Sequence, residues 1–218
     1  FKDISLVAHS MGGLVISYYL RYGDQELETA VENWSGAKDI SKVVYAGTPF
    51  QGALSIFRDL HGGVKTGFNR TLLDFEAMSS FESSYELLPT NSVVLNPKDK
   101  LVDPFFFDFS FWNRCNYGLL QNNTETRKSF LKRRLSSANK FLSLIQNPSK
   151  TEASLDVLYI KGIGRKTLAK TKWEDTSCGQ FVFKAKGDGD GLVPTYSQEL
   201  PKAYKTGSKS RRLDVEEP

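Results

Sequence analysis

The chain has 218 residues, of which 39% are hydrophobic, so it is long enough to bury one sizeable core. Its formal net charge is +4, from 29 basic and 25 acidic residues, and this ordinary balance gives no reason to expect a nucleic-acid partner. Two cysteines, Cys115 and Cys178, are too few for a disulfide framework or a zinc site, and the sequence leaves their pairing open.

The first expected elements are a buried strand and a helix. Residues 4–8 (ISLVA) form a short apolar run that is typical of a parallel sheet. Residues 10–23 have helical spacing, and Gly23 is suited to end that helix. Residues 40–47 (ISKVVYAG) predict a second buried strand. A strand, a two-residue turn and a helix make half of a βαβ unit.

The middle of the chain holds one strong helix signal. Residues 68–88 are expected to be loosely helical, and residues 91–123 to be irregular. From 125 to 146, apolar residues recur at steps of three and four, which predicts a helix with one apolar stripe. The stripe consists of Leu131, Leu135, Ala138, Leu142 and Ile145.

Strands return in the last third of the chain. Residues 154–162 (SLDVLYIKG) predict a third buried strand, and residues 179–187 alternate as an edge strand or hairpin arm does. Strands that alternate with helices favour an α/β fold with a mainly parallel sheet. We expect a single domain over residues 1–218.

Basic side chains cluster in residues 127–140 and 205–212. A solvated helix face and a solvated tail are the simpler interpretation, and contact with a phosphate-bearing lipid headgroup is the alternative. No membrane span or signal peptide is visible. The chain begins at Phe1 rather than methionine, so we expect a fragment, truncated at both ends. The compartment stays unknown, with a slight preference for the cytoplasm.

Ser10 is the candidate nucleophile. It follows a buried strand and opens a helix, within the small-residue sequence Ala8-His9-Ser10-Met11-Gly12. A nucleophilic serine needs a sharp turn that lifts its hydroxyl clear of the sheet, and backbone N–H groups that face the oxyanion. The Met11 N–H is the expected oxyanion donor. The simpler alternative is a serine that caps an ordinary helix.

The sequence LVAHSMGGLV resembles the nucleophile elbow of α/β-hydrolase lipases. That resemblance implies a serine, a histidine and an acid in one active site. The second oxyanion donor then comes from a loop ahead of Phe1. Neither histidine of the sequence is well placed as the base: His9 adjoins Ser10 and is expected to pack beneath the turn, and His61 is expected in a loop. We therefore expect the base beyond Pro218, or else an inactive chain.

The candidate acid lies in GDGDGLVP (187–194), where glycines flank Asp188 and Asp190. A surface turn is the simpler alternative, and a calcium loop is disfavoured because the EF-hand pattern is incomplete. The run resembles the acid motif of the lecithin:cholesterol acyltransferase and lysosomal phospholipase A2 family. The family spacing, three residues before a valine, assigns the acid to Asp190 and leaves Asp188 in reserve. Leu192 replaces the usual threonine.

Further stretches resemble this family in the same order along the chain. They are VVYAGTPFQGAL, SSYELLPT and VLYIKGIGRKT. The resemblance implies an α/β-hydrolase fold with a lid or cap insertion, assigned to residues 91–150. Six aromatic residues fall within positions 105–112, so substrate-binding side chains are assigned to Phe105, Phe106, Phe107 and Trp112. The alternative is that these rings fill a core.

The sequence thus predicts a serine esterase, lipase-type hydrolase or O-acyltransferase that acts on lipid esters through an acyl-serine. Neither a metal nor an organic cofactor is required. The expected partner is a lipid or another acyl ester, with peripheral membrane contact as an open possibility. The alternative function is an inactive hydrolase-fold protein that binds lipid or another partner.

Overall fold

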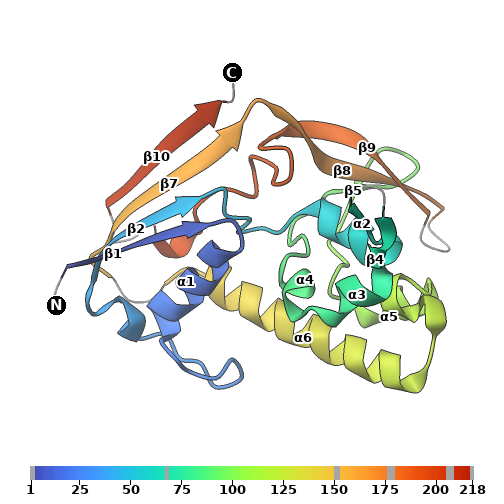
Figure 1. The fold of residues 1–218 in the computed structure, drawn as a ribbon, viewed down its shortest axis with the longest axis horizontal. Helices are drawn as coiled ribbons and strands as arrows, with labels where there is room; N and C mark the ends of the chain where they lie inside the picture. Colours follow the sequence, from blue (N-terminus) through green and yellow to red (C-terminus); the bar gives the residue numbers. More distant parts are fainter. Residues whose placement is uncertain (1–2, 67–68, 150–152, 176–179, 205–208, 217–218) are drawn as a thin grey trace. The chain divides into compact units, whose positions relative to one another are not determined.

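A computed structural model of the chain describes residues 3–66, 69–149, 153–175, 180–204 and 209–216 (Figure 1). The chain divides into two compact units. Unit 1 comprises residues 1–51, 140–167 and 188–218, and unit 2 comprises residues 52–139 and 168–187. The single domain and the 91–150 lid stay predictions. Cys178 lies outside the described residues, so its pairing is not described.

Unit 1 is built on a parallel sheet with the strand order β1-β2-β7-β10. His9 is paired with Ala46, and Ala46 with Ile160, so the first three strands end at the same edge. The predicted α/β fold with a mainly parallel sheet is confirmed. The strands are β1 (Ile4–His9), β2 (Ile40–Ala46), β7 (Asp156–Ile163) and β10 (Lys209–Glu216).

Helix α1 (Gly12–Tyr22) lies on one face of this sheet (Figure 1). The contact is centred on Tyr45 of β2, which is 1% exposed. The Ser17 hydroxyl of α1 donates to the Tyr45 hydroxyl at 3.3 Å, and the Tyr204 ring packs edge-on against Tyr45. The 3₁₀ helices η1 (Ser35–Ala37) and η3 (Lys202–Tyr204) also belong to this unit.

Unit 2 combines short helices with two small sheets. One sheet is an antiparallel pair of β3 and β4, and the other has the order β6-β5-β8-β9. Strands β8 and β9 each run from one unit into the other. The strands are β3 (Val64–Thr66), β4 (Asn69–Leu73), β5 (Val94–Leu95), β6 (Leu101–Val102), β8 (Arg165–Asp175) and β9 (Gln180–Gly189).

The core of unit 2 is aromatic. The Phe57 ring of α2 stacks on Tyr117 with a centroid separation of 4.5 Å and meets Phe106 edge-on at 4.9 Å. The helices of this unit are α2 (Leu54–Gly62), α3 (Phe75–Ser80), α4 (Glu82–Glu86), α5 (Phe109–Arg114) and the 3₁₀ helix η2 (Gly118–Asn122). Helix α6 (Glu125–Gln146) begins in this unit and ends in unit 1.

The predicted helix at 125–146 is confirmed, and its apolar stripe is buried at every position from Leu131 to Ile145. The expected helical run at 68–88 is partly wrong, since a strand occupies its start up to Leu73. The basic run at 205–212 is solvent-exposed over its described residues, as expected, but it is not an irregular tail. Its described residues begin strand β10, although every side chain of that strand is exposed.

Candidate active site

Ser10 occupies the turn between β1 and α1. Its φ is +53°, in the left-handed region that residues with a side chain seldom adopt. Two backbone hydrogen bonds hold this turn: the Ser10 N–H donates to Ala46 O at 2.9 Å, and the Gly13 N–H donates to Ser10 O at 3.0 Å. Strained backbone at a serine between a parallel strand and a helix is the geometry of a nucleophile elbow.

The two glycines after Met11 have different structural roles. A Cβ added at Gly13 would lie 2.8 Å from the Thr48 Cβ, so only glycine fits there without a shift. A Cβ added at Gly12 would meet nothing within 4 Å. Position 12 therefore has room for a side chain, and position 13 is the crowded one.

The Ser10 hydroxyl and the Met11 N–H are the two polar groups expected to act in this turn. Within the described part of the chain, no hydrogen bond engages the Ser10 hydroxyl or the Met11 N–H. Ser10 is half-buried, and the Met11 side chain is 37% exposed. The N–H of Met11 lies at the positive end of the α1 dipole, which favours a developing negative charge.

Asp190 lies at the edge of the sheet where β2 and β7 end. A Cβ added at Gly162, the penultimate residue of β7, would lie 2.6 Å from the Asp190 Cβ. A Cβ added at Gly47, directly after β2, would lie 3.3 Å from the Asp190 Oδ2. Since Ser10 directly follows β1 in the same parallel sheet, Ser10 and Asp190 share one edge of unit 1.

The carboxylate of Asp190 is held at one oxygen only. Its Oδ1 accepts the N–H of Val193 at 2.7 Å and that of Leu192 at 2.9 Å. Among the described residues, no hydrogen bond reaches Oδ2. The loop therefore fixes one oxygen of the carboxylate through two backbone hydrogen bonds.

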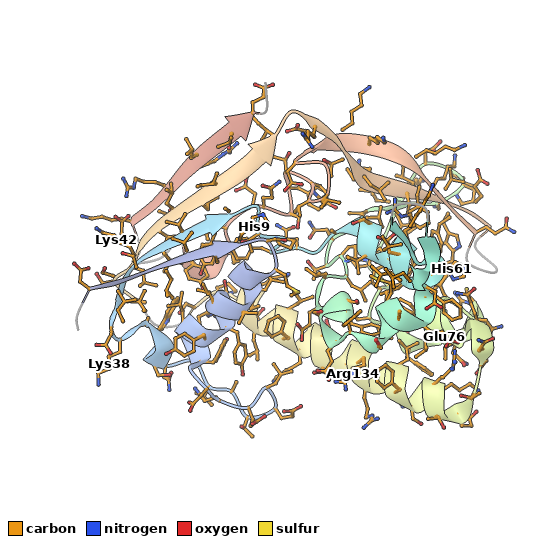
Figure 2. All side chains as sticks on the ribbon, viewed as in Figure 1. His9, Lys38, Lys42, His61, Glu76 and Arg134 are labelled. Atoms are coloured by element: carbon orange, nitrogen blue, oxygen red, sulfur yellow. The ribbon has the colours of Figure 1, made fainter. Side chains whose placement is uncertain are left out.

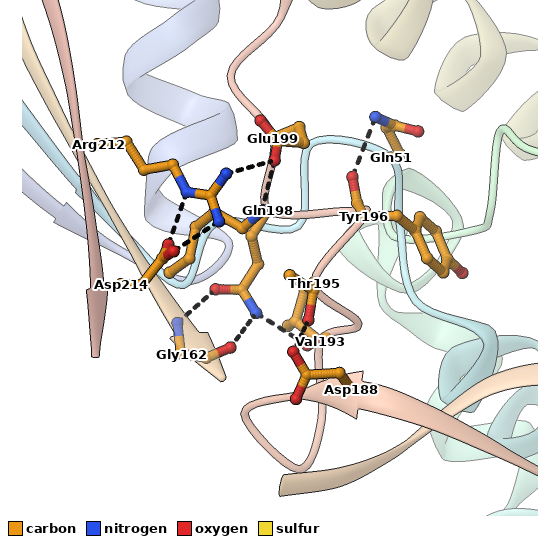
Figure 3. Close-up of polar contacts among 11 residues, drawn as sticks. Gln51, Gly162, Asp188, Val193, Thr195, Tyr196, Gln198, Glu199, Arg212 and Asp214 are labelled. Carbon is orange, nitrogen blue, oxygen red and sulfur yellow. Dashed lines mark hydrogen bonds and ion pairs between the residues drawn. The ribbon is translucent and has the colours of Figure 1, made fainter. Parts of the chain in front are cut away.

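Asp188 differs from Asp190 in this respect. Its Oδ1 accepts the Gly164 N–H at 2.7 Å, and its Oδ2 accepts the Thr195 hydroxyl at 2.8 Å (Figure 3). The Thr195 hydrogen bond, followed by that from Gly164, holds the pKa of the Asp188 carboxyl below its ordinary value. One oxygen of Asp188 thus binds the backbone directly after β7, and the other binds Thr195, so both oxygens are engaged in structural contacts.

A small pocket of about 200 Å³ opens beside Asp190. Arg165 and Val215 contribute to its lining, together with Gly162, Ile163 and Asp190. Val215 belongs to β10 and is paired with Gly162. The last described residues of the chain therefore leave the sheet next to the Asp190 carboxylate.

Neither histidine contacts Ser10 or Asp190 through a hydrogen bond in the described residues. His9 ends β1 and is exposed (Figure 2), so the expectation that it packs beneath the turn is wrong. His61 lies in the last turn of α2 in unit 2, so the expectation that it lies in a loop is wrong. Its Nδ1 accepts the Gly118 N–H at 3.1 Å, and its ring stacks on Tyr117. Burial lowers the pKa of His61.

The aromatic residues predicted to bind substrate belong to unit 2. Phe106 and Trp112 are fully buried, and the Trp112 Nε1–H donates to Phe106 O at 2.9 Å. Phe105 and Phe107 are half-buried. The burial of Phe106 and Trp112 agrees with the core alternative, while a substrate-binding role for the four residues stays a prediction.

Gly47 and Gly162 were not singled out from the sequence, although both make room for Asp190. Each lies at the end of an apolar strand, where a glycine is a recognised signal for close approach of another chain segment. Among the described residues, no group of three or more His, Cys, Asp and Glu side chains is arranged to hold a metal ion. No helix within the described ranges is long and apolar enough to span a membrane.

Residues 1–98 match the model of the lecithin:cholesterol acyltransferase family. The resemblance expected from the motifs is thus confirmed over this segment. No curated protein matches the chain.

The chain is also similar to a chain in the crystal structure of the Tle4–Tli4 complex, with a TM-score of 0.59 and 16% sequence identity. The likeness covers 96% of this chain and 52% of that one, so this chain spans about half the length of its structural neighbour. At this identity the likeness establishes the fold alone.

Proposed function

We propose that the chain carries the nucleophile and the acid of a serine-dependent acyl hydrolase or O-acyltransferase that acts on lipid esters. The observation that carries this proposal is the arrangement at one sheet edge. A strained serine with an unengaged hydroxyl follows β1, and a carboxylate with one unengaged oxygen lies over the ends of β2 and β7. The family match over residues 1–98 supports lipid esters as the substrate class.

In this mechanism the Ser10 Oγ attacks the acyl carbonyl, and its proton passes to a histidine whose ring is oriented by the Asp190 Oδ2. The Met11 N–H donates to the oxyanion of the tetrahedral intermediate. The imidazolium then protonates the leaving alcohol, and an acyl-serine remains. Water releases a fatty acid from it, whereas an acceptor alcohol takes the acyl group as a new ester.

We propose that this histidine lies outside the 218 residues, in a segment that follows β10. Two observations support this placement. Strand β10 ends beside Asp190, with Val215 paired to Gly162. The chain also spans only about half of its structural neighbour. The pocket of about 200 Å³ beside Asp190 is a suitable place for an imidazole ring.

The test compares Asp190→Asn with Asp188→Asn in the natural full-length protein, using p-nitrophenyl esters and phospholipid vesicles as substrates. Asp190→Asn should lower kcat by about 10³-fold or more, because the histidine loses its orienting charge. In Asp188→Asn the amide oxygen can still accept the Gly164 N–H, and the amide NH2 can donate to the Thr195 hydroxyl oxygen. This variant should therefore retain activity within about tenfold. Equal losses in both variants would contradict the assignment of the acid to Asp190.

An inactive lipid-binding protein on the same scaffold is the second candidate. It is favoured by the lack of a histidine hydrogen bond to Ser10 or Asp190 among the described residues. The same assay separates the two candidates. Vesicle binding by the full-length protein without ester turnover, unchanged in Ser10→Ala, would support the binding protein and exclude the enzyme.

A further inference from the structure

Gln198 is a buried amide between the loop of Asp190 and the end of β7. Its side chain belongs to a residue that is only 2% exposed. Figure 3 shows it pointing toward Gly162 and Val193, away from the exposed ion pairs of β10. A buried amide requires hydrogen bonds to compensate for its lost hydration, and Gln198 has three of them.

All three hydrogen bonds go to the backbone. The Gly162 N–H donates to the Gln198 Oε1 at 2.8 Å, and the Gln198 Nε2 donates to Gly162 O at 3.1 Å. The same Nε2 donates to Val193 O at 2.9 Å. Gln198 thus joins the C-terminal end of strand β7 to the loop that follows Asp190.

Both residues that Gln198 holds are supports of Asp190. Gly162 is the residue against which the Asp190 Cβ packs. Val193 donates its N–H to the Asp190 Oδ1 and accepts a hydrogen bond from the Asp190 N–H at 3.3 Å. A shift of either support would move the carboxylate, whose Oδ1 also accepts the Leu192 N–H of the same loop.

The residue after Gln198 strengthens the same junction. Glu199 forms an ion pair with Lys161, whose side chain is 2% exposed. Two consecutive residues of the loop are therefore anchored to two consecutive residues of β7. This double attachment makes the position of residues 193–199 on the sheet well defined.

We propose that Gln198 is a positioning residue for the acid: its amide fixes the distance between the end of β7 and the Asp190 loop, and so aims the Oδ2 of Asp190. This inference rests on the proposed function for its effect on catalysis. Gln198 touches neither the substrate nor the reacting atoms and acts only through Asp190.

The chain provides a matched control in Gln25. Its Nε2 donates to Tyr22 O at 2.7 Å and to Val31 O at 2.9 Å, and its Oε1 accepts the Val31 N–H at 2.9 Å. Gln25 therefore makes the same set of three backbone hydrogen bonds, but in the loop after α1. Methionine at either position retains the length of the side chain and removes all three bonds.

The experiment measures kcat and KM of the full-length protein on a p-nitrophenyl ester for four variants: Gln198→Met, Gln198→Glu, Gln25→Met and Ser10→Ala. Gln198→Met should lower kcat by about 10- to 100-fold, because a misplaced carboxylate orients the base poorly, and should change KM by less than about twofold. Gln25→Met should keep the wild-type kcat. Gln198→Glu retains the acceptor but turns a carboxylate oxygen toward the carbonyls of Gly162 and Val193, so its kcat should fall at least as far as that of Gln198→Met.

A wild-type kcat in Gln198→Met would overturn the inference, and so would an equal loss in Gln25→Met. Amide hydrogen exchange gives a readout that does not depend on turnover. Residues 190–193 should exchange faster in Gln198→Met than in Gln25→Met, and unchanged exchange would also overturn the inference. Activity that persists in Ser10→Ala would instead refute the proposed function, and the exchange result would then decide alone whether Gln198 holds the loop.

Discussion

The left-handed backbone at Ser10 imposes a free-energy cost that glycine would avoid. A residue with a Cβ pays about 1–2 kcal/mol to hold this conformation. We predict that Ser10→Gly unfolds with a free energy about 1 kcal/mol higher than Ser10→Ala, measured by urea denaturation. Both variants should lack esterase activity. Equal stabilities would mean that the turn relaxes when the serine is removed.

Gly12 and Gly13 provide a second comparison at the scale of single residues. Gly13→Ala should lower the free energy of unfolding by about 1–3 kcal/mol, because its Cβ would overlap the buried Thr48 side chain. Gly12→Ala should stay within about 1 kcal/mol of wild type, since its Cβ meets open space. Thermal unfolding of the two variants and of Gly13→Ala with Thr48→Ala measures this difference. A double variant no more stable than Gly13→Ala alone would contradict the clash.

Arg21 links two helices of unit 1. It is 1% exposed, and its guanidinium donates to the carbonyls of Leu144, Ile145 and Asn147 at the C-terminal end of α6. Its Nε pairs with Glu32 at 2.6 Å. These carbonyls have no intrahelical donors, so the arginine both satisfies them and complements the helix dipole.

We predict that Arg21→Met lowers the free energy of unfolding by about 3–5 kcal/mol, because it removes a buried guanidinium together with its ion pair to Glu32 and its hydrogen bonds to the carbonyls at the end of α6. Arg21→Lys should recover only part of the loss, since a lysine cannot reach all four acceptors with one ammonium group. Chemical denaturation followed by far-UV circular dichroism measures both values. A loss below about 1 kcal/mol in Arg21→Met would show that water replaces the guanidinium.

His61 gives unit 2 a predicted pH dependence. Burial lowers its pKa below the ordinary value of 6.5, so the unfolded chain binds the proton more tightly than the folded one. The stability from this group is complete above pH 6.5 and is lost as the pH falls toward the folded pKa. The urea midpoint should therefore fall more between pH 7.5 and 5.5 in wild type than in His61→Asn. Identical shifts would contradict this assignment.

Elements with a clear hydrophobic period were predictable from the sequence. The stripe of α6 is buried, and the apolar runs of β1, β2 and β7 all form strands. The expected burial of β1 is wrong, because Ala8 is its only buried residue. Strand β8 (Arg165–Asp175) was missed because its residues alternate with lysines and resemble a polar loop. Strand β10 was missed for a related reason: its side chains are exposed, and only its backbone pairing with β7 defines it.

At the scale of the whole molecule, short motifs assigned the candidate site residues but not the residues that support them. Ser10 and Asp190 were assigned from short motifs, and the structure places both at one edge of the sheet in unit 1. Gly47, Gly162 and Gln198 could not be assigned this way. Their contacts with Asp190 and its loop join residues that are distant in sequence, and no local pattern encodes such contacts.

The proposed function depends on Ser10 being a reactive nucleophile in the natural full-length protein. The most direct measurement is covalent labelling by a fluorophosphonate, located by mass spectrometry of the digested protein. We predict that the label falls on Ser10, that Ser10→Ala abolishes it, and that Asp190→Asn slows it strongly. Labelling at another residue, or labelling that persists in Ser10→Ala, would contradict the account.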